Sequence, residues 1–210
     1  MKNKWPIKKL GEVADLQNGY AFRSSDYIKY SNTLNFRMSN IRPDGRVDIH
    51  YNPKYLPDSY AEKHKEFLLK DGDIVIAMTD MASDPKILGL PTIIKTEGKN
   101  LLLNQRVGKF ININEQEIFI PYLRYYLSTS LIKKYYKSLG GGGLQINISK
   151  QNVLSVKIPV PGMEEQKRIV KKLEKILAKI EEARKLQQEQ LQELELLKQS
   201  VLHKAFQGEL

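Results

Sequence analysis

The last fifty residues show a heptad pattern of apolar positions. From Met163 to about Leu202 the chain contains neither proline nor glycine, and apolar residues recur at steps that alternate between three and four. That period predicts a coiled-coil helix rather than a short amphipathic one. About 40 helical residues span roughly 60 Å, which exceeds the roughly 30 Å diameter of a small domain. We therefore predict a spacer or dimerisation arm over residues 161–210.

The predicted seam of this helix is interrupted near its middle by two glutamines. Polar seam residues lower the stability of a coiled coil but can fix its register and the number of its helices. Val170, Leu177 and Leu191 flank the seam and widen the apolar stripe, which indicates a second contact of the helix, with its own domain or a further partner. The predicted dimerisation residues are Ile169, Leu173, Ile176, Ile180, Ala183, Gln187, Gln190, Leu194, Leu197 and Val201.

Charges are unevenly distributed along the predicted arm. Residues 164–185 carry 8 basic and 5 acidic side chains, whereas residues 186–210 carry 2 and 4. Two antiparallel copies would bring the basic half of one helix near the acidic half of the other, and parallel copies would align like with like. We therefore expect an antiparallel pair. Packing of the helix on its own domain is the alternative.

Residues 1–160 show the mixed pattern of a domain with both helices and strands. Turn signals at Pro43-Asp44-Gly45 and Lys70-Asp71-Gly72-Asp73 separate short apolar runs, of which 74–77 is typical of a buried strand. Helical spacing over 121–138 predicts a helix, with Ser128-Thr129-Ser130 as the candidate point of division into two. The fold class predicted is α+β: a globular domain with a curved, mainly antiparallel sheet and flanking helices, followed by one long C-terminal coiled-coil helix.

The positive charge is concentrated in the first part of the chain. Residues 1–162 carry 24 Lys+Arg and 15 Asp+Glu, which is +9 of the total net charge of +10. A basic domain beside a nearly neutral arm favours a polyanionic partner such as nucleic acid over a basic protein whose charge has no specific partner.

Composition excludes several classes of protein. Cysteine is absent, which rules out disulfides and thiolate metal sites and is consistent with a reducing compartment, so we expect a cytoplasmic protein. Residues 1–6 lack the apolar core of a secretory signal. No apolar run approaches the ~20 residues of a membrane span, and we expect no membrane partner.

Patterns of catalytic residues are weak in this chain. Asp84-Pro85 with Glu97-Gly98-Lys99 only distantly resembles the carboxylate and lysine arrangement of metal-dependent nucleases, and the second segment is typical of a polar turn. Asn52-Pro53-Lys54-Tyr55 resembles a motif of amino-methyltransferases, but no glycine-rich strand–helix turn precedes it. The run Gly140–Gly143 lacks the lysine of a phosphate loop. We therefore expect no catalytic residue, metal site or cofactor in this chain.

A series of short segments follows a recognisable order along nearly the whole chain. The first begins Trp5-Pro6-Ile7-Lys8-Lys9-Leu10-Gly11-Glu12-Val13, the second is Asn18-Gly19-Tyr20-Ala21-Phe22, and the third contains Gly72-Asp73-Ile74. Together they resemble the DNA-specificity subunits of type I restriction–modification systems. The later matching segments are 103–107, 142–149, 158–161, 165–170, 199–202 and 205–210.

The resemblance carries expectations about organisation and partners. Typical members contain two recognition domains and two helical regions, whereas this chain shows one of each, so it resembles a half subunit, natural or truncated. The resemblance implies a target recognition domain over 1–160 and a conserved helical region over 161–210. It also implies double-stranded DNA, a second copy of the chain or another specificity half, and modification (methyltransferase) and restriction subunits as partners. S-adenosylmethionine, Mg²⁺ and ATP are then expected in those partner subunits and not in this non-catalytic chain.

Candidate DNA contacts lie in irregular polar segments of residues 1–160. Lysines mostly hold phosphates, while arginine, glutamine and asparagine read base edges. A two-fold dimer would read an inverted repeat whose half-site centres lie roughly 34–36 Å apart. The alternative is a coiled-coil adaptor that scaffolds other proteins without direct DNA readout. The candidate contacts, each of which could equally be a turn or cap residue, are Arg23, Ser24, Ser25, Thr79, Asp80, Ser83, Lys86, Gln105, Arg106, Gln145 and Asn147.

Overall fold

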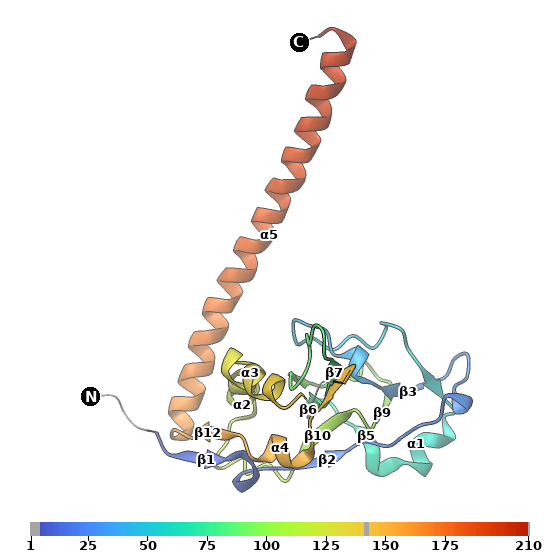
Figure 1. Cartoon of the computed structure of the whole chain (residues 1–210), viewed down its shortest axis with the longest axis vertical. Coiled ribbons are helices and arrows are strands. Elements are labelled where there is room, and N and C mark those ends of the chain that lie inside the picture. Colours follow the sequence, from blue (N-terminus) through green and yellow to red (C-terminus); the bar gives the residue numbers. More distant parts are fainter. Residues whose placement is uncertain (1–4, 141–142, 210) are drawn as a thin grey trace. The chain divides into compact units, whose positions relative to one another are not determined.

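A computed structural model describes residues 5–140 and 143–209 of the chain (Figure 1). Expectations that concern residues 1–4, Gly141, Gly142 and Leu210 lie outside these described residues. The chain divides into two compact units, Met1–Gln166 and Lys167–Leu210. Mixed helices and strands followed by a long C-terminal helix confirm the α+β class predicted from the sequence.

The described elements alternate between short strands and short helices before the last helix. The strands are β1 (Ile7–Lys9), β2 (Asp15–Asn18), β3 (Thr33–Phe36), β4 (Tyr55–Leu56), β5 (Leu68–Leu69), β6 (Ile74–Ala77), β7 (Thr79–Met81), β8 (Pro91–Ile93), β9 (Asn100–Leu103), β10 (Val107–Ile111), β11 (Gln145–Asn147) and β12 (Lys157–Pro159). The α-helices are α1 (Ser59–Lys63), α2 (Ile120–Leu127), α3 (Ser130–Ser138), α4 (Lys150–Leu154) and α5 (Met163–Gln207).

The strands form several small sheets rather than one continuous sheet. One four-stranded sheet has the order β2-β10-β6-β8 and another the order β4-β3-β9-β5, while β1 pairs with β12 and β7 with β11. Among the described strands, all pairings are antiparallel except that of β3 with β9. The mainly antiparallel character predicted from the sequence is therefore confirmed.

Strand β6 lies at the centre of the domain and is buried on both faces. Ile74 and Ile76 pack into one apolar cluster, and Val75 and Ala77 pack into a second, with all four side chains fully buried. Successive side chains of a strand point to opposite faces, so a strand with a core on each side needs a continuous apolar run. This explains why the segment 74–77 lacks the polar alternation of a half-exposed strand.

Helices α2 and α3 confirm the predicted break in the segment 121–138. Helix α2 ends at Leu127, Thr129 takes an extended conformation, and α3 begins at Ser130. Leu123, Leu127 and Ile132 are buried in the cluster that also receives Ile74 and Ile76. The two helices therefore cover one face of the β2-β10-β6-β8 sheet.

Helix α5 is continuous from Met163 to Gln207, about 68 Å at 1.5 Å per residue. Gln187 and Gln190, which interrupt the predicted apolar seam, lie within the continuous helix, because glutamine is a good helix former. Apolar side chains along the second unit remain exposed, among them Ile176, Ile180, Leu194, Leu197 and Val201. Within the part of the chain that the structure describes, no helix is both long and apolar enough to cross a membrane.

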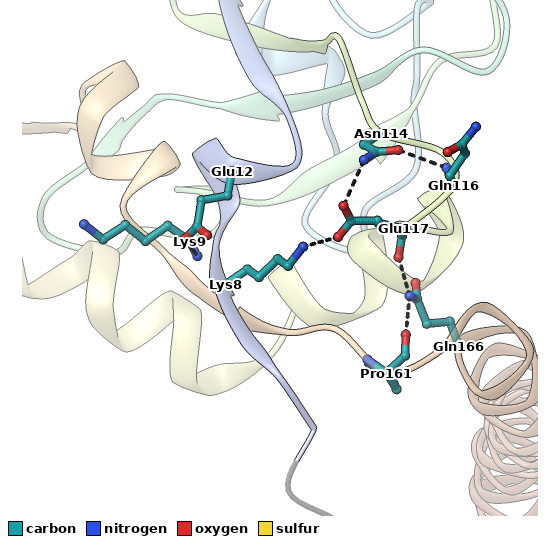
Figure 2. Close-up of polar contacts among 8 residues, drawn as sticks. All are labelled: Lys8, Lys9, Glu12, Asn114, Gln116, Glu117, Pro161 and Gln166. Carbon is teal, nitrogen blue, oxygen red and sulfur yellow. Dashed lines mark hydrogen bonds and ion pairs between the residues drawn. The ribbon is translucent and has the colours of Figure 1, made fainter.

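The first turn of α5 contains a fully buried glutamine, Gln166, whose side chain forms hydrogen bonds to the backbone (Figure 2). The side-chain amide nitrogen of Gln166 donates to the backbone carbonyls of Glu117 at 2.6 Å and Pro161 at 2.8 Å. Its oxygen accepts from the backbone N–H of Phe119 at 2.9 Å. The Glu117 side chain is held in turn by Lys8 and by Asn114. One amide thereby satisfies three backbone groups, two just before α2 and one just before α5.

Replacing Gln166 with alanine is expected to destabilise the protein by about 1–3 kcal/mol, because buried backbone groups lose their hydrogen-bond partners. The free energy of unfolding, from a urea titration, measures the loss. Gln116, an exposed residue of the same loop (Figure 2), provides the matched control, and its replacement with alanine should cost less than about 0.5 kcal/mol. Equal effects of the two substitutions would contradict the role of the buried amide.

Candidate nucleic-acid interface

Gln105 and Arg106 form the exposed corner of a tight turn between β9 and β10. The backbone N–H of Val107 donates to the carbonyl of Asn104 at 2.9 Å, and the Asn104 side-chain oxygen accepts from the N–H of Arg106 at 3.2 Å. The N–H of Gln105 donates to the carbonyl of Tyr20 at 3.0 Å. The backbone of the turn is therefore fixed on both sides. Both side chains are exposed, with no hydrogen bond to another described residue.

Gly19 permits this arrangement. A Cβ atom at position 19 would collide with the backbone of Leu103 and Asn104, because the end of β2 passes directly against the turn. Glycine is the residue that allows such a close approach of two backbones. The Asn18-Gly19 pair, which begins the segment Asn18-Gly19-Tyr20-Ala21-Phe22, thus positions the β9–β10 turn.

The β7–β11 pair is a two-stranded ribbon whose faces have different roles. Thr79 lies opposite Asn147, and Met81 lies opposite Gln145. Alternate residues of a strand share a face, so these four side chains lie on one face of the ribbon. On the other face, Ile146 and Asp80 are buried. Three of the predicted contacts therefore share this face. Asn147 is exposed and Gln145 is half-buried, whereas Thr79 is buried, with 3% of its surface exposed.

Asp80 organises the chain rather than facing a partner. Its side chain is 6% exposed, and one carboxylate oxygen accepts the backbone N–H groups of Ile87 at 2.5 Å and Leu88 at 3.0 Å. The other oxygen accepts the N–H of Met81 at 2.8 Å. The sequence-based interpretation of Asp80 as a DNA contact is thus replaced, because both of its oxygens hold the loop that follows β7.

A pocket of about 560 Å³ collects four predicted contacts from three separate segments. The hydroxyl of Thr79 donates to the side-chain oxygen of Asn147 at 2.7 Å, which fixes the orientation of that amide. The amide nitrogen of Asn147 has no hydrogen bond to another described residue. The predicted residues that line the pocket are Thr79, Gln105, Arg106 and Asn147, and the structure adds Asn18, Met78, Ile148, Ser149, Lys150 and Gln151.

The electrostatics of this pocket suit an anion. Its lining residues include an arginine, a lysine and several amides, and no carboxylate. Lys150 forms an ion pair with Asp15 at 2.7 Å, outside the lining. That hydrogen bond from Lys150, together with the N–H of Leu16, lowers the pKa of the Asp15 carboxyl below its ordinary value. The charge of Arg106 is not balanced by any ion pair with a described residue.

The remaining predicted contacts lie in two other places. Arg23 lines a separate pocket of about 220 Å³ with Tyr20, Tyr60 and His64, and Ser24 and Ser25 lie in the adjoining 3-10 turn. Burial, and secondarily Asp26, raises the pKa of the Tyr60 hydroxyl in that pocket.

Ser83 and Lys86 lie in the loop after β7, where Lys86 forms an ion pair with Asp84 at 3.2 Å. They are not among the residues that line the pocket of Arg106 and Asn147.

Asn18, Lys150 and Gln151 line the pocket but are not among the contacts predicted from the sequence. Lys150 and Gln151 begin α4, a five-residue helix capped by the Ser149 side chain, which accepts from the N–H of Asn152 at 3.1 Å. Ser149 with Asn152 is a capping box with asparagine in the third helical position, a departure from the usual glutamate or glutamine. That Ser-x-x-Asn pattern is the signal that could have located the helix. Figure 1 shows α4 beside β2, the strand that ends at Asn18.

A family model described as type I restriction modification DNA specificity domain matches residues 2–193. The chain belongs to this family. It is 31% identical over 208 residues to the type I restriction enzyme MjaVIII specificity subunit of Methanocaldococcus jannaschii, a match that covers 98% of the chain and 46% of that subunit. It is 25% identical over 211 residues to the EcoKI specificity subunit of Escherichia coli, covering 98% of the chain and 43% of that subunit.

Two solved structures share the fold of this chain. A chain from a study of complex assembly and conformational transition of the type I R-M system superimposes with a TM-score of 0.71 at 24% identity, over all of this chain and 47% of the other. The HsdS subunit of Thermoanaerobacter tengcongensis gives a TM-score of 0.60 at 25% identity, over 46% of its length. The specificity-domain chain described here thus spans about half the length of the relatives it matches.

Proposed function

We propose that this chain is a sequence-specific DNA-recognition part of a type I restriction–modification complex. The observation that carries the proposal is the pocket in which Arg106, Gln105 and Asn147 converge from two distant segments of a domain of this family. Arginine donates to guanine O6 and N7, and asparagine or glutamine pairs with adenine N6 and N7. The residues of the pocket are therefore those that read bases.

The β7–β11 ribbon supplies a suitable shape for this readout. The major groove of B-DNA admits a two-stranded β-ribbon. Gln145 and Asn147 lie on the face of the ribbon opposite to the buried Ile146 and Asp80. We infer that this face and the β9–β10 turn contact base edges together, with Thr79 holding the Asn147 amide in place.

The second unit is proposed to pair with another helix of the same kind. Its exposed apolar seam fits an antiparallel coiled coil with a second copy of this chain or with another specificity half. Each recognition domain, proposed over residues 1–160, then reads one half-site, and the paired helices over 161–210 set the half-site separation. Arg23, Ser24 and Ser25 remain proposed contacts, at the separate pocket that Arg23 lines with Tyr20 and Tyr60.

We propose that the catalytic activities of the complex reside in partner subunits. The relatives of this chain are named specificity subunits, and we infer that the chain directs modification (methyltransferase) and restriction subunits without catalysing a reaction itself. Among the described residues, no group of three His, Cys, Asp or Glu side chains is placed to hold a metal ion. In this proposal, S-adenosylmethionine, Mg²⁺ and ATP belong to the partner subunits. We also propose that the complex lies in the cytoplasm.

A binding titration tests the proposal. Methylome sequencing of the source organism supplies the target, and duplexes with the target or a shuffled target are titrated across salt, with the methyltransferase subunit present. We expect the target duplex to bind about 10³-fold or more tightly, with a steep decline of affinity as salt rises. Equal binding of both duplexes with no salt dependence would favour the coiled-coil adaptor instead.

A further inference from the structure

Three lysines on α3 face the loop that follows β7 across a hollow of about 260 Å³. Lys133, Lys134 and Lys137 are exposed, and none forms an ion pair with another described residue. We call these three residues the α3 lysine cluster. The hydroxyl-bearing residues Ser83 and Ser130 line the same hollow.

The α3 lysine cluster is unfavourable when no anion is bound. Lys133 and Lys137 lie one helical turn apart, and like charges at that spacing repel each other. Asp84 is the one carboxylate among the residues that line the hollow, and it is already paired with Lys86 at 3.2 Å. The hollow therefore has an unbalanced positive charge that an incoming anion would neutralise.

The loop opposite the cluster is held in a fixed shape at both ends. At its start, Asp80 binds the N–H groups of Ile87 and Leu88. At its end, Gly89 has a φ of +67° and lies against the buried ring of Tyr136, where a Cβ atom would collide with the ring. Only glycine combines this conformation with this approach. The loop is thus anchored to the core on both sides of Ser83.

Ser83 of the hollow follows the last residue of β7 by two positions along the chain. Thr79 and Ser83 are four residues apart, at most about 13 Å along an extended strand. That distance corresponds to about four base-pair steps of 3.4 Å along the DNA axis. A duplex whose major groove holds the β7–β11 ribbon would therefore carry backbone phosphates within reach of α3.

We propose that the α3 lysine cluster, with Ser83 and Ser130, binds the phosphate backbone of the target DNA beside the base-reading ribbon. The inference rests on the proposed function and adds residues to it. Phosphate oxygens accept hydrogen bonds from ammonium and hydroxyl groups alike. An acidic protein surface is the less favoured partner, because lysine is depleted in the cores of protein interfaces.

The test replaces Lys133, Lys134 and Lys137 together with glutamine, which removes the charge but keeps a polar side chain and a similar helix propensity. Each phosphate contact contributes about 0.9 to the slope of log affinity against log salt, so the slope should become less steep by roughly 2–3. Target and shuffled duplexes should lose affinity equally, because phosphate contacts carry no sequence information. The ratio of their affinities should change by less than about two-fold.

A matched control removes the same charge elsewhere. Lys9, Lys65 and Lys70 are exposed and lie outside the hollow, so their joint replacement with glutamine should leave the slope within about one unit of the parent value. The inference is overturned if the α3 variant keeps the parent slope, or if the control loses as much.

An unchanged DNA slope with lost assembly of the methyltransferase subunit would assign the α3 lysine cluster to an acidic protein surface and also overturn the inference. Failure of the parent chain to prefer its target duplex would instead contradict the proposed function. Thermal melts of both triple variants should match the parent, because all six lysines are exposed.

Discussion

A chain that carries aspartate at Ile176, Ile180 and Leu194 is expected to be monomeric at micromolar concentrations where the parent chain is a dimer. These side chains are 46%, 43% and 62% exposed in the single chain, so the substitutions remove few contacts within it. In a paired seam, each would bury an ionised carboxylate in apolar surroundings, which costs several kcal/mol. Sedimentation equilibrium measures the change in mass.

The control for this prediction lies on the opposite face of the same helix. At 100° per residue, Ala178, Gln192 and Leu196 project away from Ile176 and Ile180. Aspartate at these three positions adds the same charge and should leave the dimer intact. A monomeric parent chain, or equal dissociation of both variants, would contradict pairing through the predicted seam.

The absence of cysteine allows the orientation of the helices to be tested separately. A single cysteine introduced at Leu173 or at Val201 should not form a disulfide with its own copy in an antiparallel pair, because both positions lie far from the middle of the seam. If positions 173 and 201 oppose each other in the antiparallel pair, a mixture of the two variants should form a disulfide between the cysteine of one variant and that of the other. Rapid self-linking at either position would show a parallel pair.

Replacing Arg106 or Asn147 with alanine is expected to weaken binding of the target duplex by about 1–3 kcal/mol each, or roughly 5- to 150-fold. The shuffled duplex should lose far less affinity, because base contacts contribute little to non-specific binding. The ratio of the two dissociation constants is therefore the measurement. Since both side chains line one pocket, the double variant is expected to lose less than the sum of the single losses.

Two further variants separate base contact from positioning. Thr79→Val keeps the shape of the side chain but removes the hydroxyl that binds the Asn147 oxygen, so it should lower specificity less than Asn147→Ala does. Gln116→Ala removes an exposed amide outside the pocket and should leave the affinity for both duplexes unchanged. Unchanged discrimination by the Arg106 and Asn147 variants would exclude this pocket as the reading site.

Local patterns in the sequence were sufficient to predict the secondary-structure elements that depend on neighbouring residues. The heptad repeat predicts α5 because helical periodicity involves residues three and four apart. The apolar run 74–77 and the division between α2 and α3 were likewise readable from neighbouring residues. The short strand β12 was not, because the sequence preference of three residues is weak and pairing with the distant β1 decides it.

The sequence alone determined the fold class, the long helix, the positive charge of the first unit and the resemblance to a family. It proposed eleven polar residues as DNA contacts without grouping them. Only the tertiary structure decided that Thr79 meets Asn147 across 68 residues of chain, and that Asp80, next to Thr79, faces the core. The physical reason is that strand pairing joins residues far apart in sequence, and a strand directs successive side chains to opposite faces.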